Sequence, residues 1–151
     1  MKHYKELAWL MERIIHKYIQ YEKKPQVYCK DIILTQPEIH TIAIVGDSEG
    51  INITQLAKVR GITKGAVSQM VNKLVDRDLM EKRVSPDSDA AICLYLTKKG
   101  KAARNDHRKM HENMGTMYEA MLDQIPESTL DSMRQFLEAF DRALDDMDKS
   151  V

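Results

Sequence analysis

The sequence lacks several features that would define other classes of protein. Two cysteines, Cys29 and Cys93, among 151 residues are too few for a scaffold held by disulfides. The longest apolar stretch, residues 39–45, is interrupted by polar side chains and is far shorter than the roughly 20 residues of a membrane helix. The first residues show no apolar core followed by small residues, so no signal peptide is expected. These absences predict a cytoplasmic protein with reduced cysteines and no membrane partner.

Aromatic residues are also scarce, at 6% of the chain, and ten methionines share the packing of the interior. The hydrophobic fraction of 43% and the charged fraction of 30% exclude both a disordered chain and a collagen-like one. A chain of this length can bury one core and is too short for two ordinary domains. We therefore expect residues 1–151 to form a single domain.

The formal net charge of zero conceals an uneven distribution along the chain. Residues 1–51 carry seven basic and seven acidic side chains, residues 52–104 carry 11 and 5, and residues 105–151 carry 5 and 11. A basic block within a neutral protein is typical of a surface that binds a polyanion. The alternative is an ordinary solvated surface with uneven charge.

The first part of the chain predicts two helices. Apolar residues at three-and-four spacing place one stripe on a helix over residues 4–23, which Lys24 and Pro25 end. An irregular link then leads to residues 35–38, Thr-Gln-Pro-Glu, which form a capping box with an early proline. The second helix is expected to run from this box to residue 45.

Two short helices joined by a tight turn follow a loop at residues 46–50. Thr54 is expected to open a helix over residues 55–60, Gly61 to end it, and Thr63 to cap a helix that runs to about residue 78. Residues 80–84 and 92–96 flank a polar turn and read as a β-hairpin. Thr97 then caps a long helix over residues 98–123, and Pro126 opens a last helix.

This order of elements is the plan of a winged helix-turn-helix, in which the second helix enters the major groove of DNA. The predicted second helix has a polar outer face, whose Gln and Asn side chains can pair with adenine, Ser with several bases, and Lys with guanine or phosphate. The start of the helix also offers backbone N–H groups to a phosphate. The alternative is an ordinary solvent-exposed face. The candidate DNA-binding residues on this helix are Thr63, Lys64, Gly65, Ser68, Gln69, Asn72 and Lys73.

Residues 52–57 (NITQLA), 61–68 (GITKGAVS) and 94–100 (LYLTKKG) resemble the MarR family of transcription regulators, and the resemblance extends over about residues 5–147. It implies a mainly α, winged-helix fold with a DNA-binding lobe at residues 33–100. It also implies dimerisation helices at residues 1–24 and 101–148, which would intertwine in a homodimer. The implied function is regulation of transcription, most often repression, at a pseudo-palindromic operator.

One departure from the family lies in the wing, where members usually carry an arginine that enters the minor groove. This chain has Ala90 and Ala91 at that place. Lys82 and Arg83, on the strand that leads into the wing, remain as candidate phosphate contacts. We expect a weaker wing contact, and a salt dependence of DNA binding that is lower by about one unit of slope.

Four of the five histidines, at positions 16, 40, 107 and 111, are arranged informatively outside the predicted DNA-reading segment, and two of them suggest a metal site. His107 and His111 are four residues apart on the long helix, and such a pair can bind one zinc if further ligands come from elsewhere. Glu22 and His40, at the end of the first helix and the start of the second, are the candidates for those ligands. Nitrogen and carboxylate ligands of this kind also accept nickel or cobalt.

These four residues also resemble the zinc-responsive branch of the MarR family, which uses a glutamate and three histidines at matching places. That branch has a second site, for which Cys29 and Asp106 are the comparable residues here. The second match is partial, because Ile39 stands where that branch has a glutamate. The resemblance implies that zinc favours the dimer whose recognition helices lie about 34 Å apart and so strengthens DNA binding.

Other readings of the chain remain open. The effector could be an oxidant that acts through Cys29, near three lysines in sequence, or a phenolic ligand in a cleft lined by Trp9, Tyr18 and methionines. The lobe could instead be an interaction module that does not bind specific DNA. An enzyme is not expected, because the residues between His107 and His111 include no glutamate to act as the general base of a zinc protease.

Overall fold

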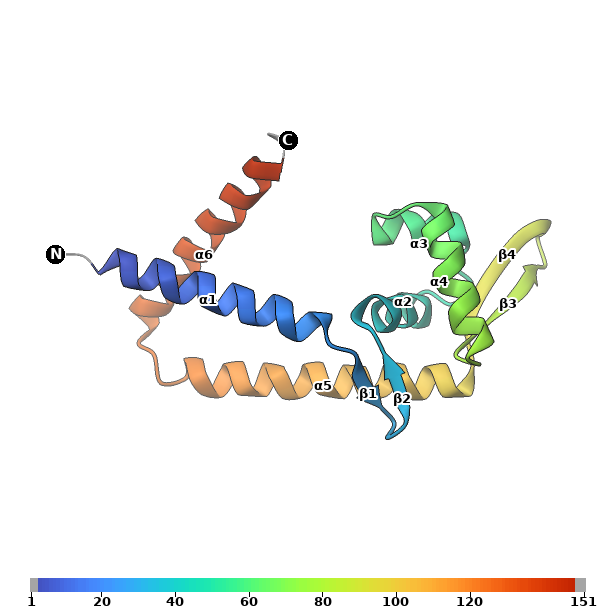
Figure 1. Ribbon diagram of the computed structural model, residues 1–151, viewed down its shortest axis with the longest axis horizontal. Helices are drawn as coiled ribbons and strands as arrows, with labels where there is room; N and C mark the ends of the chain where they lie inside the picture. Colours follow the sequence, from blue (N-terminus) through green and yellow to red (C-terminus); the bar gives the residue numbers. More distant parts are fainter. Residues whose placement is uncertain (1–2, 149–151) are drawn as a thin grey trace. The chain divides into compact units, whose positions relative to one another are not determined.

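The computed structural model describes residues 3–148, with the side chains of residues 88–90 and 148 left outside the description. The chain divides into two compact units, Met1–Arg108 and Lys109–Val151. Figure 1 shows helices and short strands in the order α1, β1, β2, α2, α3, α4, β3, β4, α5, α6. The elements have these bounds: α1 Tyr4–Lys23, β1 Gln26–Tyr28, β2 Ile32–Leu34, α2 Gln36–Asp47, α3 Ile53–Arg60, α4 Lys64–Asp76, β3 Met80–Ser85, β4 Ser88–Leu96, α5 Lys98–Leu122 and α6 Glu127–Asp148.

The mainly α, winged-helix fold predicted from the sequence is confirmed, and three of its helices begin at the predicted caps. The Thr35 side chain accepts a hydrogen bond from the Glu38 N–H, and the Glu38 carboxylate accepts one from the Thr35 N–H. Thr63 caps α4 through the Ala66 N–H, and Thr97 caps α5 through the Gly100 N–H. These caps satisfy backbone donors that a helix leaves unpaired at its first turn.

Two local predictions are wrong. The link between the first two helices is a β-hairpin, in which Val27 pairs with Ile33 and the turn residues Cys29 and Lys30 both have positive φ. Positive φ is uncommon for residues other than glycine, so the sequence carried no ordinary hairpin signal. Helix α3 is capped by Asn52, one residue before its first turn, in a capping box with Gln55, and not by Thr54.

The wing is an antiparallel hairpin of β3 and β4, in register from the pair Met80–Leu96 to the pair Val84–Ile92. The segment before α3 joins its outer edge, since the Leu94 N–H donates to the Ile51 carbonyl oxygen at 2.9 Å. Figure 1 shows this hairpin beside the end of α4. The wing is therefore tied by backbone hydrogen bonds to the segment that leads into α3, the first helix of the helix-turn-helix.

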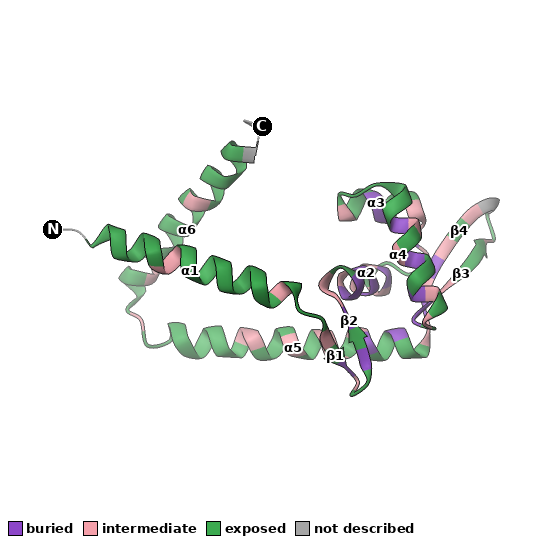
Figure 2. Ribbon diagram, in the orientation of Figure 1, coloured by how far each residue is buried: buried purple, intermediate pink, exposed green. Residues whose placement is uncertain are grey.

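The core of the chain lies in the β1–β2 hairpin, α2, α3, α4, the wing strands and the first turns of α5, where Figure 2 shows the buried positions. Helix α4 contributes Val67, Val71 and Leu74, while Met70 and Val75 are half-buried. The other fully buried side chains come from each neighbouring element: Leu34, Ile39, Ile42, Val45, Leu56, Leu79, Met80, Leu94 and Ala103. This core holds α4 by one face and leaves its opposite face to solvent.

Helix α1 has no buried residue, and α6 likewise shows only exposed and half-buried positions along its described length (Figure 2). Apolar side chains nevertheless line both helices, among them Leu7, Ile14 and Tyr18 in α1 and Phe136 and Leu137 in α6. Across residues 3–148, no helix combines the length and apolarity needed to cross a bilayer.

Candidate nucleic-acid interface

Helix α4 presents the predicted polar face to solvent. Thr63, Lys64, Gly65, Gln69 and Asn72 are exposed, and Ser68 is half-buried. The first turn of the helix has no acidic residue, so its positive dipole end meets no carboxylate from its own sequence. This arrangement can present hydrogen-bond donors and acceptors to base edges and backbone N–H groups to a phosphate.

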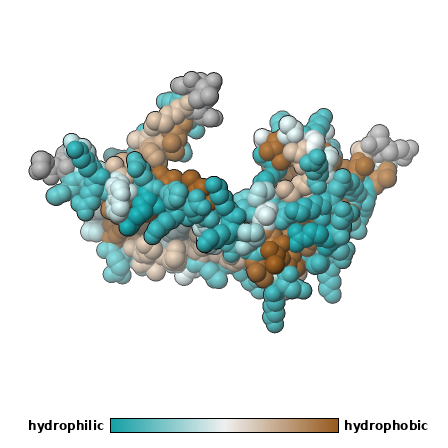
Figure 3. Space-filling model, viewed as in Figure 1, coloured by the Kyte–Doolittle hydropathy of each residue, from teal (hydrophilic) through white to brown (hydrophobic). Residues whose placement is uncertain are grey.

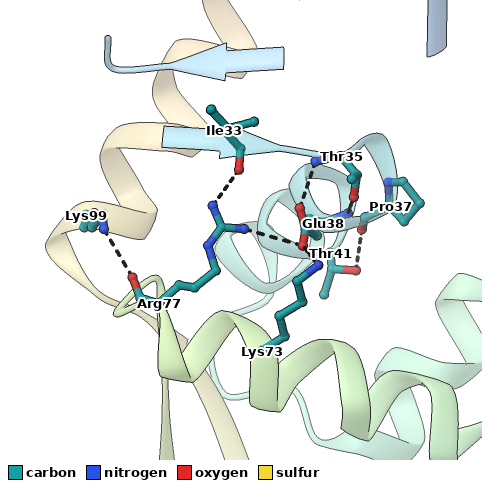
Figure 4. A network of polar contacts seen from close by, with 8 residues as sticks. All are labelled: Ile33, Thr35, Pro37, Glu38, Thr41, Lys73, Arg77 and Lys99. Atoms are coloured by element: carbon teal, nitrogen blue, oxygen red, sulfur yellow. Dashed lines mark hydrogen bonds and ion pairs between the residues drawn. The ribbon is translucent and has the colours of Figure 1, made fainter. Parts of the chain in front are cut away.

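Lys73 lies at the edge of this face and is paired inward. Its ammonium nitrogen lies 2.6 Å from Oε1 of Glu38, a carboxylate that is 2% exposed on α2. Figure 4 shows Lys73 and Arg77 reaching Glu38 from the same side of α4. Arg77 lies 3.5 Å from the same oxygen and also donates to the Ile33 carbonyl oxygen at 2.5 Å. Lys73, a candidate DNA contact, therefore also helps to hold α4 against α2.

The Glu38 carboxyl has a pKa below its ordinary value of 4.5. Burial by itself would raise this pKa, and the hydrogen bonds from Lys73 and from the Thr35 N–H, together with the Lys73 charge, outweigh burial. One carboxylate therefore caps α2 and binds two cations of the recognition helix. The ion pair couples the orientation of α4 to α2 and β2.

The two wing candidates have different surroundings. Lys82 donates to the Asn72 side-chain oxygen on α4. Arg83 lies over the Tyr95 ring, 4.2 Å from its centroid, and is bonded to Glu81. Alternate residues of a strand point to opposite faces, so one cation faces α4 and the other faces away from it. At the wing tip, Ala91 is half-buried, and the Ala90 side chain lies outside the described residues.

The candidate metal ligands are only partly brought together. The His40 and His107 rings lie edge to face with centroids 5.7 Å apart, and His107 also faces the Tyr28 ring at 6.1 Å. Burial raises the pKa of Tyr28, and the negative charges of Tyr21 and Asp106 raise it further. Among the side chains that the structure describes, no group of three or more from His, Cys, Asp or Glu is arranged to hold a metal ion.

The remaining candidates have other neighbours. The Asp106 carboxylate accepts a hydrogen bond from the Cys29 backbone N–H at 3.0 Å, which ties the β1–β2 turn to α5. Glu22 lines an open cavity of about 560 Å³ together with Thr35, Glu38 and Lys73. His111, one turn beyond His107 on α5, is exposed. The structure thus joins Cys29 with Asp106 and His40 with His107, and places Glu22 in a different group of side chains.

Sequence reasoning missed Arg77, and it identified Glu38 only as a capping residue. The signal for Glu38 was its position in the capping box, which says nothing about a second partner some 35 residues later in the chain. It also missed the exposed apolar pair Val27 and Ile33, which belongs to the hairpin where Figure 3 shows a hydrophobic patch.

The part of the chain that matches a known family includes the helix-turn-helix and the first strand of the wing. The sequence pattern of the MarR family matches residues 34–89, from the end of β2 to the start of β4. This segment of the chain is therefore similar to the MarR family. The prediction made from residues 52–57, 61–68 and 94–100 is thereby confirmed.

A curated relative and two solved structures extend this result. The chain is 29% identical over 97 residues to YhjH, an uncharacterised HTH-type transcriptional regulator of Bacillus subtilis, and the match covers 64% of this chain and 55% of YhjH. It is 25% identical to Streptococcus pneumoniae FabT in complex with DNA, with a TM-score of 0.72 over 95% of this chain and 99% of FabT. The zinc-responsive MarR protein ZitR of Lactococcus lactis has the same fold, with 20% identity and a TM-score of 0.73 over 91% of this chain and 99% of ZitR.

The curated relatives that match are named as transcriptional regulators, which agrees with the prediction of a MarR protein that is not an enzyme. The chain spans little more than half of the length of YhjH. The likeness to ZitR, at 20% identity, establishes the fold of this chain.

Proposed function

We propose that this MarR protein is a cytoplasmic transcription regulator, acting as a repressor, that binds duplex DNA as a homodimer through α4. The observation that carries the proposal is the exposed polar face of α4, with Lys64, Gln69 and Asn72, mounted on a buried core and flanked by the wing. The basic composition of residues 52–104 supports it, because cations that neutralise phosphates supply much of the affinity for DNA. The FabT structure, solved with DNA, has the same fold.

The test is binding of the purified protein to labelled duplex DNA, measured by fluorescence anisotropy at a series of salt concentrations. We expect affinity to fall steeply with salt, and Lys64→Ala to reduce the logarithmic salt slope by about one unit. Lys109→Ala is the matched control, since Lys109 is an exposed lysine of α5 outside residues 33–100 and should leave the slope unchanged. A slope indistinguishable from zero for the wild type would overturn the proposal and favour an interaction module.

The proposal of a homodimer rests on the exposed apolar side chains of α1 and α6. Large apolar side chains on both helices are exposed in the single chain, including Leu7 at 62% and Leu137 at 57%. A row of exposed apolar side chains of this extent is characteristic of a surface that another protein covers. A second copy is the occupant that also supplies two recognition helices to a two-fold symmetric operator.

We further infer that a transition metal, zinc in the first place, regulates DNA binding. The observation in favour is the contact of the His40 and His107 rings, which join α2 to α5. Imidazole nitrogens suit zinc, and His111 lies one turn beyond His107 on α5. The ZitR structure is described as zinc-responsive, and Glu22, His40, His107 and His111 would be the ligands here, with Cys29 and Asp106 at a second site. Since Glu22 lines a cavity with Thr35, Glu38 and Lys73, zinc binding would require side chains to move.

Zinc titration of the chelator-treated protein tests this inference. We expect at least one zinc per chain, with loss of binding in a His107→Ala, His111→Ala double variant and tighter DNA binding by the wild type when zinc is present. His16→Ala is the control, because His16 is an exposed histidine of α1 outside the candidate set. If the wild type takes up no zinc, the inference fails, and oxidation of Cys29 or a phenolic ligand becomes the next effector to test.

A further inference from the structure

Lys82 reaches the recognition helix from the wing. It follows Met80 by two residues on β3 and is in register with Leu94 on β4, and both of these apolar residues are buried. Residues two apart on a strand share a face, so the Lys82 side chain starts from the inner face of the wing. Its apolar stem can follow that face while its ammonium group lies at the surface. The ammonium group arrives beside Asn72 on the outer face of α4.

The contact determines the orientation of the Asn72 amide. Lys82 Nζ donates to Asn72 Oδ1 at 2.5 Å. An ammonium group has three donors and no acceptor, so only the amide oxygen can face it. The Asn72 NH₂ group is then the part of the amide left to face outward. Both side chains are exposed, so both are available to a base in the major groove.

The chemistry of this pair differs from that of a lone asparagine. An asparagine reads adenine with both ends of its amide, accepting from the N6 amino group and donating to N7, whereas guanine presents two acceptors, O6 and N7. Here one lone pair of the amide oxygen accepts from a cation, and the pair offers the N–H donors of Asn72 and Lys82. An adenine amino group at this place would meet a positive charge and an oxygen that already accepts a strong hydrogen bond.

We propose that Lys82 converts Asn72 from a reader of adenine into part of a donor pair that reads guanine, so that these two residues set base preference at one position of each operator half-site. This inference rests on the proposed DNA-binding function. It assigns Lys82 a role in specificity, in place of the phosphate contact expected from the sequence. Arg83, the neighbouring wing cation, lies on Tyr95 and Glu81 and has no such role.

The experiment selects bound duplexes from a library with a randomised centre, using the wild-type protein and four variants. We expect a guanine at one position of each half-site for the wild type, and loss of that preference in Asn72→Ala. In Lys82→Met, which keeps the stem and removes the ammonium group, adenine should replace guanine at the same position, a reversal of about tenfold on duplexes that differ only there. Lys82→Arg restores a cationic donor and should retain guanine, and Arg83→Met should leave the preference unchanged.

Two results would overturn the inference. One is a wild-type preference for adenine at the position that depends on Asn72. The other is an unchanged preference in Lys82→Met, with all duplexes bound more weakly to the same degree, which would make Lys82 a phosphate contact. Failure of the wild type to bind any duplex in a salt-dependent manner is a different result, because it overturns the proposed function itself.

Discussion

The winged-helix lobe and the helices α1 and α6 bury their apolar residues to very different degrees. In the lobe, Leu56, Leu74 and Leu94 are completely buried and pack in one core. In α1 and α6, leucines of the same size, Leu7 and Leu137, are more than half exposed. The apolar stripes are equally clear in the sequence of both regions. The difference shows that an amphipathic stripe predicts that a face will be covered and does not tell whether its own chain covers it.

The difference in burial between the lobe and helices α1 and α6 also bears on function. The lobe buries its apolar side chains within the single chain, and the polar face of α4 stays exposed to a ligand. Helices α1 and α6 lack such a core, so their stability should depend on a second chain and hence on protein concentration. The lobe should thus be sensitive to changes in internal packing, and α1 and α6 to changes on their surface.

The largest effect is expected for a methyl group added within the lobe. A Cβ at Gly100 would lie 1.9 Å from the Leu79 carbonyl oxygen, a backbone atom that cannot move aside easily. We expect Gly100→Ala to lower the free energy of unfolding by about 3 kcal/mol or more. Gly115→Ala on the same helix is the control, since nothing lies within 4 Å of its Cβ and alanine favours a helix by about 1 kcal/mol. Urea denaturation at one protein concentration measures both, and equal effects would remove the contrast.

The next effect concerns α6. Leu137→Glu places a charge in the exposed apolar stripe, and we expect the dimer dissociation constant to rise by at least about 30-fold, as for an interface residue worth about 2 kcal/mol. Sedimentation equilibrium measures this constant. Gln135→Glu adds the same charge two positions away on the same helix, outside the stripe, and should leave the dimer intact. A dimer that tolerates Leu137→Glu would show that α6 is covered in another way or not at all.

A smaller effect is expected at the ion pair that mounts the recognition helix. Glu38→Gln keeps the size of the side chain and removes the charge that binds Lys73 and Arg77, at a cost of about 1.5 kcal/mol in unfolding free energy. The lobe should still fold, because the Thr35 N–H can donate to the glutamine oxygen. Circular dichroism during thermal unfolding follows the loss, and an unchanged midpoint would mean that the ion pair adds no net stability.

The weakest effect is expected for the change in unfolding free energy with pH, to which the Glu38 carboxylate contributes. Because the pKa of Glu38 is lowered in the folded chain, its contribution is fully present above the ordinary value of 4.5 and is lost as the pH falls through the lowered pKa. The difference in stability between the wild type and Glu38→Gln should therefore shrink on acidification through this range. A difference that stays constant down to the acid transition would show that ionisation of Glu38 does not stabilise the lobe.

Features encoded by neighbouring residues could be predicted from the sequence. The capping box of Thr35 and Glu38 spans four residues, and the Thr63 and Thr97 caps act on backbone groups three residues away. The alternation of polar and apolar residues on α4 likewise identified which face would be buried. Asn52 was overlooked because Thr54, a good cap by residue type, lies two positions later, and only the backbone geometry chooses between them.

The β1–β2 hairpin could not be predicted in the same way. Its turn uses Cys29 and Lys30 with positive φ, where the usual signal is Asn-Gly or Asp-Gly. The cost of this backbone geometry is offset by contacts from distant residues, including the bond from the Cys29 N–H to Asp106, 77 residues later. No local pattern can report such a contact.

The sequence by itself therefore determined the resemblance to the MarR family, the order of the helices and of the two wing strands, and the face of α4 that meets solvent, because caps and periodicity act within one or two turns of a helix. Only the tertiary structure decided that Lys73 is held by Glu38, that Lys82 bonds to Asn72, and that His40 meets His107. Charge and hydrogen-bonding capacity can be read from residue types. Which groups use that capacity on each other depends on distances that folding sets between residues far apart in the chain.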